Sequence, residues 1–313
     1  MSGLGVVFWK ELADNFASRR FLIMVLLICL IALFTAYLSG QVLRAKPLEA
    51  STEFLFLRLF TSPTQSLPSF ISFLSLFGSL LGIIFGFDAI NSEQSTGTMS
   101  LVLSQPVFRD SFINGKFLAG LATIAVIFVS IILIVFGLEL RMFGILPEGT
   151  ELARLALFLA ISVIYAGFWV SLGILFSILF RRTTTSILTS IAAWFFFTFF
   201  IYMVANVVAD QIAPITQKAT GEIILKHTQI QNIILRASPG TLYGEAVNVV
   251  LNPSVRTLGL VFSQEIKEII PAPLSISQSL MIIWPQLVTL MILMLVCFAI
   301  SYVIFMKREI RST

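Results

Sequence analysis

The sequence predicts an all-α polytopic membrane protein of six transmembrane helices, with an N-terminal amphipathic interfacial helix and a helical external loop. Hydrophobic residues make up 58% of the 313 residues and charged residues only 12%, whereas an ordinary soluble domain carries about 25% charged residues. The mean hydropathy is +0.98, and the apolar runs are continuous rather than alternating, which favours helices over barrel strands. Soluble enzymes, secreted disulfide scaffolds and disordered chains are excluded.

Six apolar runs are long enough to cross the hydrocarbon core, which takes about 20 helical residues. They cover residues 21–38, 68–90, 117–138, 155–180, 186–209 and 280–306. Residues 1–313 therefore form a single transmembrane domain, with an external loop over residues 210–279. The first run could be mistaken for a signal peptide, but it is long enough to span and no small-residue cleavage site follows, so we expect a retained helix.

Loop charges predict the orientation of these spans. With the N-terminus inside, the cytoplasmic segments carry ten basic and five acidic residues, and the longer external segments carry ten of each. The pairs Arg181–Arg182 and Lys307–Arg308 give the strongest local signals. We expect both termini in the cytoplasm of a prokaryote whose plasma membrane holds the protein.

Residues 4–16 form a candidate amphipathic helix in the headgroup plane, the alternative being a solvated leader. A step of 100° per residue predicts one apolar arc. The arc holds Leu4, Phe8, Trp9, Leu12 and Phe16, with Lys10, Glu11 and Asp14 opposite and Val7 as an exception. On the external side we expect a short helix in TEFLFLRLF and a small helical cap over residues 210–279, lying against the outer membrane surface.

Gly78, Gly82 and Gly86 recur at four-residue spacing and share one face of the second span. Such a face lets a neighbouring backbone approach closely. Packing within the chain, the lining of a substrate passage and a dimer seam all remain open. The sequence predicts no catalytic, metal or cofactor site. The only Gly-Lys pair, Gly115–Lys116, lacks the first glycine and the hydroxyl that a P-loop needs.

The loop between the second and third spans reads FDAINSEQSTGTMSLVLSQPVFRDSFINGKFL. Gly97 can take the left-handed conformation that ends the helical extension of the second span. Thr98 can then cap a short helix whose apolar residues are Met99, Leu101, Val102 and Leu103, and Pro106 stops it. The local pattern predicts a short helix across the inner membrane face, the alternative being an ordinary hairpin loop.

This loop resembles the signature of type-2 ABC transporter permeases. The matching residues, in order, are Glu93, Gly97, Thr98, Ser104, Gln105, Pro106, Arg109, Gly115 and Lys116. Three further stretches resemble the same family: FWKELADNFASRRF, SPGTLYGEAVNVVLNP, and WPQLVTL with FMKREIR. The resemblance covers essentially the whole chain, and its branch is close to the permeases of nitrous-oxide-reductase maturation systems, although no residue of the sequence defines the substrate.

The resemblance implies a permease subunit of an ATP-driven exporter, without an ATP site of its own. Its implied partners are a second permease in a homodimer, two copies of a separate ATP-binding subunit and the lipid bilayer, but no nucleic acid. The loop would be the ATPase contact. A stand-alone ion-coupled carrier and a membrane scaffold without transport are the alternatives from other classes, although spans almost free of charge disfavour an ion-coupled carrier.

Overall fold

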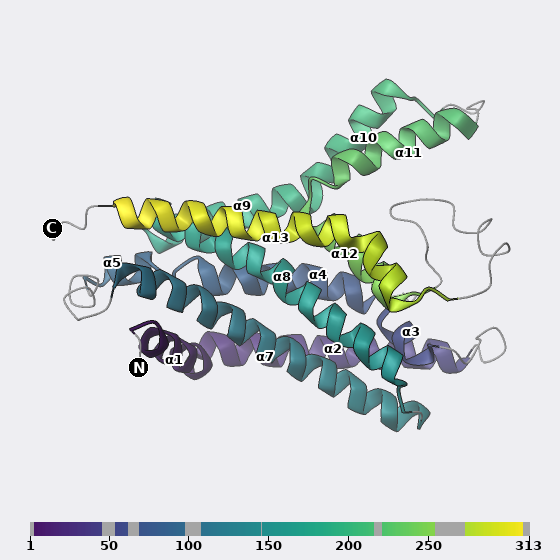
Figure 1. Ribbon diagram of the computed structural model, residues 1–313, viewed down its shortest axis with the longest axis horizontal. Coiled ribbons are helices and arrows are strands. Elements are labelled where there is room, and N and C mark those ends of the chain that lie inside the picture. The colour runs from purple at the N-terminus through teal and green to yellow at the C-terminus, as the bar shows by residue number, and fades with distance from the viewer. Residues whose placement is uncertain are drawn as a thin grey trace.

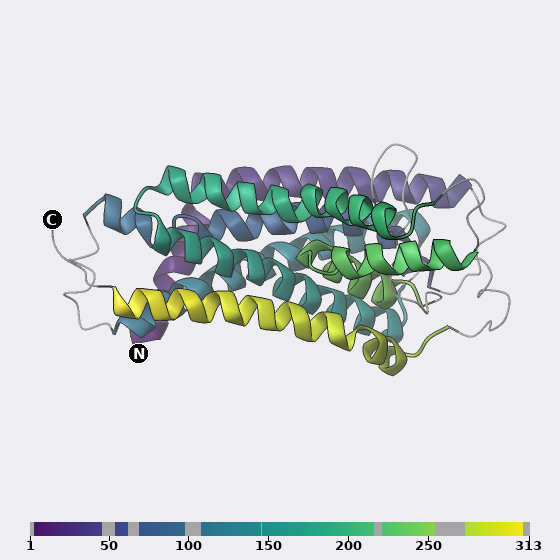
Figure 2. The same ribbon diagram turned by 90° about the horizontal axis from the view of Figure 1, so that it is seen from above.

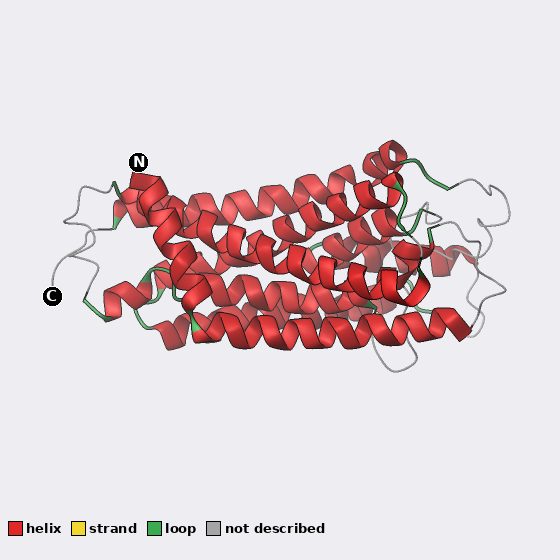
Figure 3. Cartoon of the chain, turned by 90° about the horizontal axis from the view of Figure 1, so that it is seen from below, coloured by secondary structure: helices red, strands yellow, loops and turns green. Residues whose placement is uncertain are grey.

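The protein is described by a computed structural model over residues 3–45, 54–61, 69–97, 108–144, 146–215, 221–253 and 273–308. All regular elements in these ranges are helical (Figure 3). They are α1 (Gly3–Ala17), α2 (Arg19–Ala45), α3 (Leu55–Thr61), α4 (Phe70–Gly86), α5 (Asn91–Ser95), α7 (Arg109–Phe143), α8 (Gly149–Leu179), α9 (Thr183–Phe195), η1 (Phe196–Phe200), α10 (Ile201–Ile212), α11 (Gly221–Leu235), α12 (Pro239–Leu251) and α13 (Ile276–Lys307).

Six helical stretches of the described chain are long and apolar enough to cross a membrane. They are Phe21–Val42, Phe70–Ser95, Arg109–Phe143, Gly149–Leu179, Thr183–Ile212 and Ile276–Lys307. Each overlaps one of the predicted runs, which confirms the fold class. The helices extend past the apolar runs because a helix ends at a capping signal rather than at a polar residue. For α7 that signal is Gly144, whose φ of +67° ends the helix.

Helix α8 lies at the centre of the bundle. It packs most extensively against α4 and α13, and its Phe158 and Trp169 side chains are almost fully buried. The outer helices instead expose large apolar side chains, such as Leu26 of α2, Leu188 of α9 and Met281 of α13. Such a surface is stable in hydrocarbon but not in water.

The long helices run side by side along the longest axis of the molecule (Figures 1 and 2). Helices α1 and α5 and the last turn of α13 lie at one end of the bundle, which we call the terminal end, and α3 lies at the opposite end (Figure 1). The end of α5 and the start of α7, which flank residues 98–107 in the sequence, are therefore at the same end as the start of α1 and the end of α13.

Helices α10 and α11 leave the bundle as a hairpin (Figure 1). The departure begins at the π-helical turn Phe196–Phe200. There the carbonyl of Phe197 accepts a hydrogen bond from the Ser238 hydroxyl at 2.8 Å, as expected where a π-turn interrupts the regular ladder. The hairpin is joined by a 2.6 Å hydrogen bond from Gln231 to Asn206.

Helix α12 differs from the predicted surface cap because it is buried in the bundle. Its Tyr243 is fully buried, with its ring centroid 4.5 Å from that of Tyr165 in α8. Apolar residues occupy most faces of α12, so it stabilises the fold from inside the core. Arg154 of α8, itself 2% exposed, donates to the carbonyls of Val250 and Leu274 and so holds both ends of the neighbouring loop.

Helix α1 forms, and it packs on α7 through residues outside the predicted apolar arc. Val7, the predicted exception, is the buried residue of α1, whereas Trp9 and Phe16 are exposed. The face toward α7 also carries Glu11, which was placed on the opposite side. The ion pair between Glu11 and Lys116 of α7 determines which side of α1 faces α7. The pattern of apolar residues in α1 does not include that interaction.

Candidate functional site

The candidate site is the group of segments at the terminal end of the bundle that flank residues 98–107. Helix α5 precedes these residues and the first two turns of α7 follow them. The predicted loop residues Thr98, Met99, Leu101, Leu103, Ser104, Gln105 and Pro106 lie outside the described residues, as does the predicted short helix. Glu93, Gly97, Arg109 and Lys116 are described.

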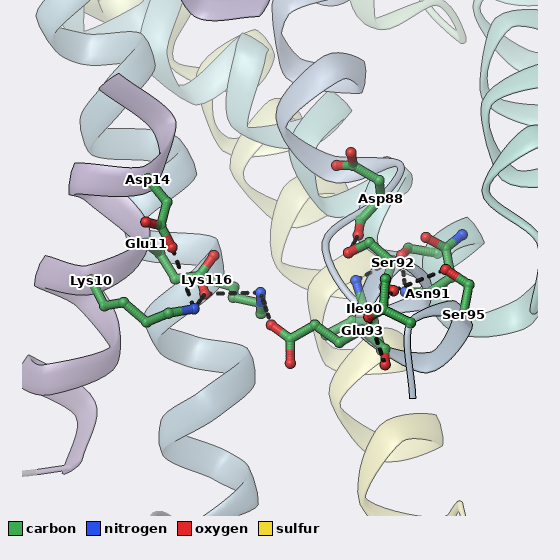
Figure 4. A network of polar contacts seen from close by, with 12 residues as sticks. Lys10, Glu11, Asp14, Asp88, Ile90, Asn91, Ser92, Glu93, Ser95 and Lys116 are labelled. Atoms are coloured by element: carbon green, nitrogen blue, oxygen red, sulfur yellow. Dashed lines mark hydrogen bonds and ion pairs between the residues drawn. The ribbon is translucent and has the colours of Figure 1, made fainter. Parts of the chain in front are cut away.

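A buried lysine joins two helices at this end (Figure 4). The ammonium of Lys116 in α7 lies 3.0 Å from Glu11 Oε1 of α1 and 2.8 Å from Glu93 Oε1 of α5. The Lys116 side chain is only 6% exposed. Removal of one member of a buried charged group costs about 3–5 kcal/mol, since the remaining charge loses its partner. Lys116 therefore holds α1 and α5 to the same point of α7.

Lys10 extends this network toward the surface (Figure 4). Its ammonium lies 3.1 Å from the same Glu11 oxygen and 3.4 Å from Asp14, but its side chain is 59% exposed. Burial alone would raise the pKa of Glu11, but the charge and hydrogen bond of Lys116, aided by Lys10, outweigh it and lower that pKa. The Glu11 carboxylate is thus charged at neutral pH.

Gly115, the residue before Lys116, lets α1 approach α7 closely. A Cβ at this position would lie 2.6 Å from Cγ1 of Val7 and 3.3 Å from the backbone nitrogen of Phe8. Distances under 3.0 Å are not tolerated without a shift of the neighbouring atoms. The Gly115–Lys116 pair therefore places a notch, the space left by the missing side chain of Gly115, beside the charge of Lys116. Val7 of α1 fills the notch, and Glu11 of α1 pairs with the Lys116 ammonium.

The corner between α4 and α5 is fixed to α8 and α9. The Ser177 hydroxyl accepts the backbone N–H groups of Ile90 and Asn91 at 2.9 and 3.0 Å. The Ser186 hydroxyl donates to the carbonyl of Phe87 at 2.7 Å. Each bond joins two segments that are separated by 86 or more residues in the sequence. The start of α5 is therefore bonded to the central helix α8 through Ser177.

A polar cavity of about 190 Å³ lies between α1, α2, α4 and α7 at this end. Glu11, Asn15, Asp88 and Lys116 contribute polar groups to its wall, and apolar groups come from α2 and α4. Asn15 donates a 3.2 Å hydrogen bond to the Thr123 hydroxyl of α7. The contact between α1 and the bundle is therefore polar and loosely filled on one side.

The other described loop residues have structural partners of their own. Gly97 has a φ of +73°, the left-handed conformation that the sequence predicts. Arg109 donates a 3.3 Å hydrogen bond to the carbonyl of Arg308, so the start of α7 contacts the end of α13. Arg308 in turn donates to the carbonyl of Ile178 in α8. The segments around residues 98–107 are thus connected to most of the bundle.

The glycines of the second span face α8 of the same chain. A Cβ at Gly82 would lie 2.5 Å from the carbonyl oxygen of Ala166 and 2.6 Å from Cβ of Trp169. Gly86 has equally close neighbours in Val170 and Gly173, whereas Gly78 is less tightly enclosed. This geometry corresponds to packing within the chain, the first of the three predicted uses of that face.

Sequence reasoning missed three residues that organise this end: Glu11, Val7 and Ser177. Glu11 looked like part of a solvated face, and its spacing of four residues from Val7 is a helical signal that gains meaning only beside Gly115–Lys116. Ser177 lies in an apolar run and carries no pattern at all. Only the meeting of distant segments reveals that its hydroxyl accepts two backbone N–H groups.

Comparisons with known proteins identify the family of the chain. A sequence profile of the ABC-2 family transporter proteins matches residues 6–310. Two curated relatives are each described as "probable ABC transporter permease protein NosY". The one from Stutzerimonas stutzeri is 30% identical over 146 residues, 47% of this chain and 47% of the relative. The one from Pseudomonas aeruginosa is 33% identical over 113 residues, 35% of each chain. The aligned part thus spans about half of the first relative's length and about a third of the second's.

Proposed function

The chain belongs to the ABC-2 family of transporter proteins, and from this premise we propose that it couples ATP hydrolysis by a separate ATP-binding subunit to the export of a substrate. Membership makes the chain the membrane subunit of an ABC transporter, as the relatives' description as permeases also indicates. The ATP chemistry then resides in the partner.

We place the terminal end of the bundle in the cytoplasm, because the basic pairs Arg181–Arg182 and Lys307–Arg308 lie in or next to its loops. ATP is available on that side. The segment 93–116 is the longest connection between spans there, whereas α8 and α9 are separated by only a few residues. The middle of this segment, residues 98–107, is therefore the proposed docking element.

The observation that carries this proposal is the position of that segment. It leaves the bundle from α5, which is bonded to α8 through Ser177 and to α7 through Lys116, and returns as α7 itself. A push on residues 98–107 would act directly on three helices. We propose that closure of two ATP-binding subunits moves this loop in each of two permease copies, and that the paired bundles then alternate their access to the substrate.

The first test is co-purification of the permease with an ABC ATP-binding subunit from the same organism. Leu101→Asp should reduce the amount of ATPase that co-purifies, because burial of one such side chain in a partner contributes about 1.5–3 kcal/mol. Leu146→Asp is the matched control, since Leu146 is 73% exposed and lies at the opposite end of the bundle. It should leave ATPase binding unchanged.

Membrane insertion of both variants is checked by yield in the membrane fraction. Equal ATPase binding by the wild type, Leu101→Asp and Leu146→Asp would show that the loop is not the docking element. Purification of the wild-type permease without any ATPase, under conditions that keep the bundle folded, would contradict the proposed function itself.

A further inference from the structure

We infer that Gly115 and Lys116 form a seat for helix α1, and that Lys116 is the positioning residue through which a displacement of α5 reaches α1. The inference rests on the proposed function only for the cause of that displacement. In this inference, α1 moves together with segment 93–116 and does not simply lie at the membrane surface. Gly115 and Lys116 then act inside the permease, not at the ATPase surface.

Burial is the first argument. A residue that contacts a partner subunit has to be exposed in the isolated chain, whereas the Lys116 side chain is 6% exposed and both of its acidic partners are 14–15% exposed. Its phenyl neighbour Phe112 covers it further, with the ammonium 4.9 Å from the ring centroid. Lys116 is therefore committed to contacts within the chain.

Shape is the second argument. The notch at Gly115 receives Val7, and Glu11 lies one helical turn farther along the same face of α1, where it reaches Lys116. Apolar and charged contacts on one face fix both the rotation and the position of α1 along α7. By contrast, α1 makes few contacts with α2, which follows it in the sequence. The seat on α7 is the main attachment of α1.

The shared ammonium is the third argument. Glu11 and Glu93 come from different helices, and both lie within 3.0 Å of the same Lys116 nitrogen. If α5 moves while α1 stays on α7, Glu93 is drawn away from the buried Lys116 ammonium, which is costly. The lower-energy path moves α1, α5 and the start of α7 together. Asn15, which bonds Thr123 across the neighbouring polar cavity, adds only one neutral hydrogen bond to α7.

The seat is tested in the permease alone by amide hydrogen exchange of α1. Lys116→Met should accelerate exchange in α1 by about a hundredfold, because a buried charged group is broken. Lys10→Met is the matched control: it removes a positive charge from the same Glu11, but an exposed one, so the acceleration should stay under about fivefold. Lys116→Arg, which keeps the charge, should restore protection.

The notch is tested in the same way. Gly115→Ala should accelerate exchange in α1 because the new methyl group meets Val7, and the double variant Gly115→Ala with Val7→Ala should recover part of the protection. If Lys116→Met and Lys10→Met exchange equally, or if Val7→Ala brings no recovery, the seat does not exist. Neither result depends on whether an ATPase binds.

The joint movement is tested in the complex with the ATPase, by distances between spin labels at the exposed positions Ala13 of α1 and Ser95 of α5. The labelled chain is diluted with unlabelled chains, and Cys29 and Cys297 are replaced by alanine. ATP should leave the Ala13–Ser95 distance unchanged while the distance from Ala13 to Leu188 of α9 changes. In the Glu93→Gln variant, where α1 stays seated but loses its link to α5, ATP should change the Ala13–Ser95 distance.

The outcomes separate the two proposals. An ATP-dependent Ala13–Ser95 distance in the wild type would overturn the positioning role of Lys116, even with the ATPase bound and the seat intact. Undiminished ATPase binding by Leu101→Asp would overturn the docking role of the loop and leave the seat standing.

Discussion

Gly86 of α4 and Gly173 of α8 face each other so closely that a Cβ built on either would stand 2.9 Å from the Cα of the other. Two helix backbones can approach each other so closely only where neither of the facing residues carries a side chain. Because α8 is the buried centre of the bundle and α4 leads into α5, this contact lies on the route from the candidate coupling segment to the core. In the proposed coupling, a tight α4–α8 contact is required for a displacement of α5 to reach the core without loss.

The first prediction concerns this contact. Gly82→Ala places a methyl group 2.5 Å from the Ala166 carbonyl oxygen, and we expect it to lower the free energy of unfolding by about 1–3 kcal/mol. Gly137→Ala is the control, because a Cβ there meets nothing within 4 Å and alanine favours the helix by about 1 kcal/mol. The Tm in detergent should fall for Gly82→Ala only. Equal Tm values for the wild type, Gly82→Ala and Gly137→Ala would mean that α4 and α8 move apart to accept the methyl group without loss of stability.

The second prediction concerns Gly97. Its φ of +73° is costly for a β-branched residue but accessible to asparagine. No atom lies within 4 Å of a Cβ built there, so any effect comes from the backbone and not from a clash. Gly97→Val should weaken ATPase binding while Gly97→Asn retains most of it, as measured by co-purification. The opposite order of the two variants would contradict the proposed turn.

The third prediction concerns topology. Single cysteines at Ser95 of α5 and Lys226 of α11, both exposed, should react with a membrane-impermeant thiol reagent from opposite sides in a chain without Cys29 and Cys297. Ser95 should be protected in intact cells and Lys226 accessible. Labelling of both positions from one side would refute the six-span arrangement with cytoplasmic termini.

The fourth prediction concerns pH. The pKa of Glu11 lies below its ordinary value of 4.5, so its pairing with Lys116 contributes stability above that value and loses it as the pH falls through the lowered pKa. The Ala13–Ser95 distance should therefore stay constant from about pH 8 to about pH 5 and change only in stronger acid. The Glu11→Gln variant should lack this acid transition. A transition near neutral pH in the wild type would argue against the pairing.

Local sequence patterns were sufficient to predict the six candidate membrane spans. A run of about 20 apolar residues has few stable states other than a membrane helix, because each unpaired backbone group is costly in hydrocarbon. The left-handed turn at Gly97 was predictable for a similar reason, since glycine adopts it without strain. Both are properties of a short stretch of chain. The side of α1 that contacts α7 could not be predicted from the apolar residues of α1, because they do not include the attraction between Glu11 and Lys116.

By itself, the sequence determined the all-α class, the six candidate spans and the membership in a transporter family, since composition, run length and local motifs carry that information. Only the tertiary structure decided that α12 is buried in the core and that the Ser177 hydroxyl accepts backbone N–H groups at the start of α5. It also decided that Glu11 and Glu93 both pair with Lys116. The ion pairs of Lys116 and the hydrogen bond of Ser177 to Asn91 join residues that are 23 to 105 positions apart. Apolar periodicity contains no term for a hydrogen bond or an ion pair between distant segments. Their energy depends on burial, which exists only once the helices have packed.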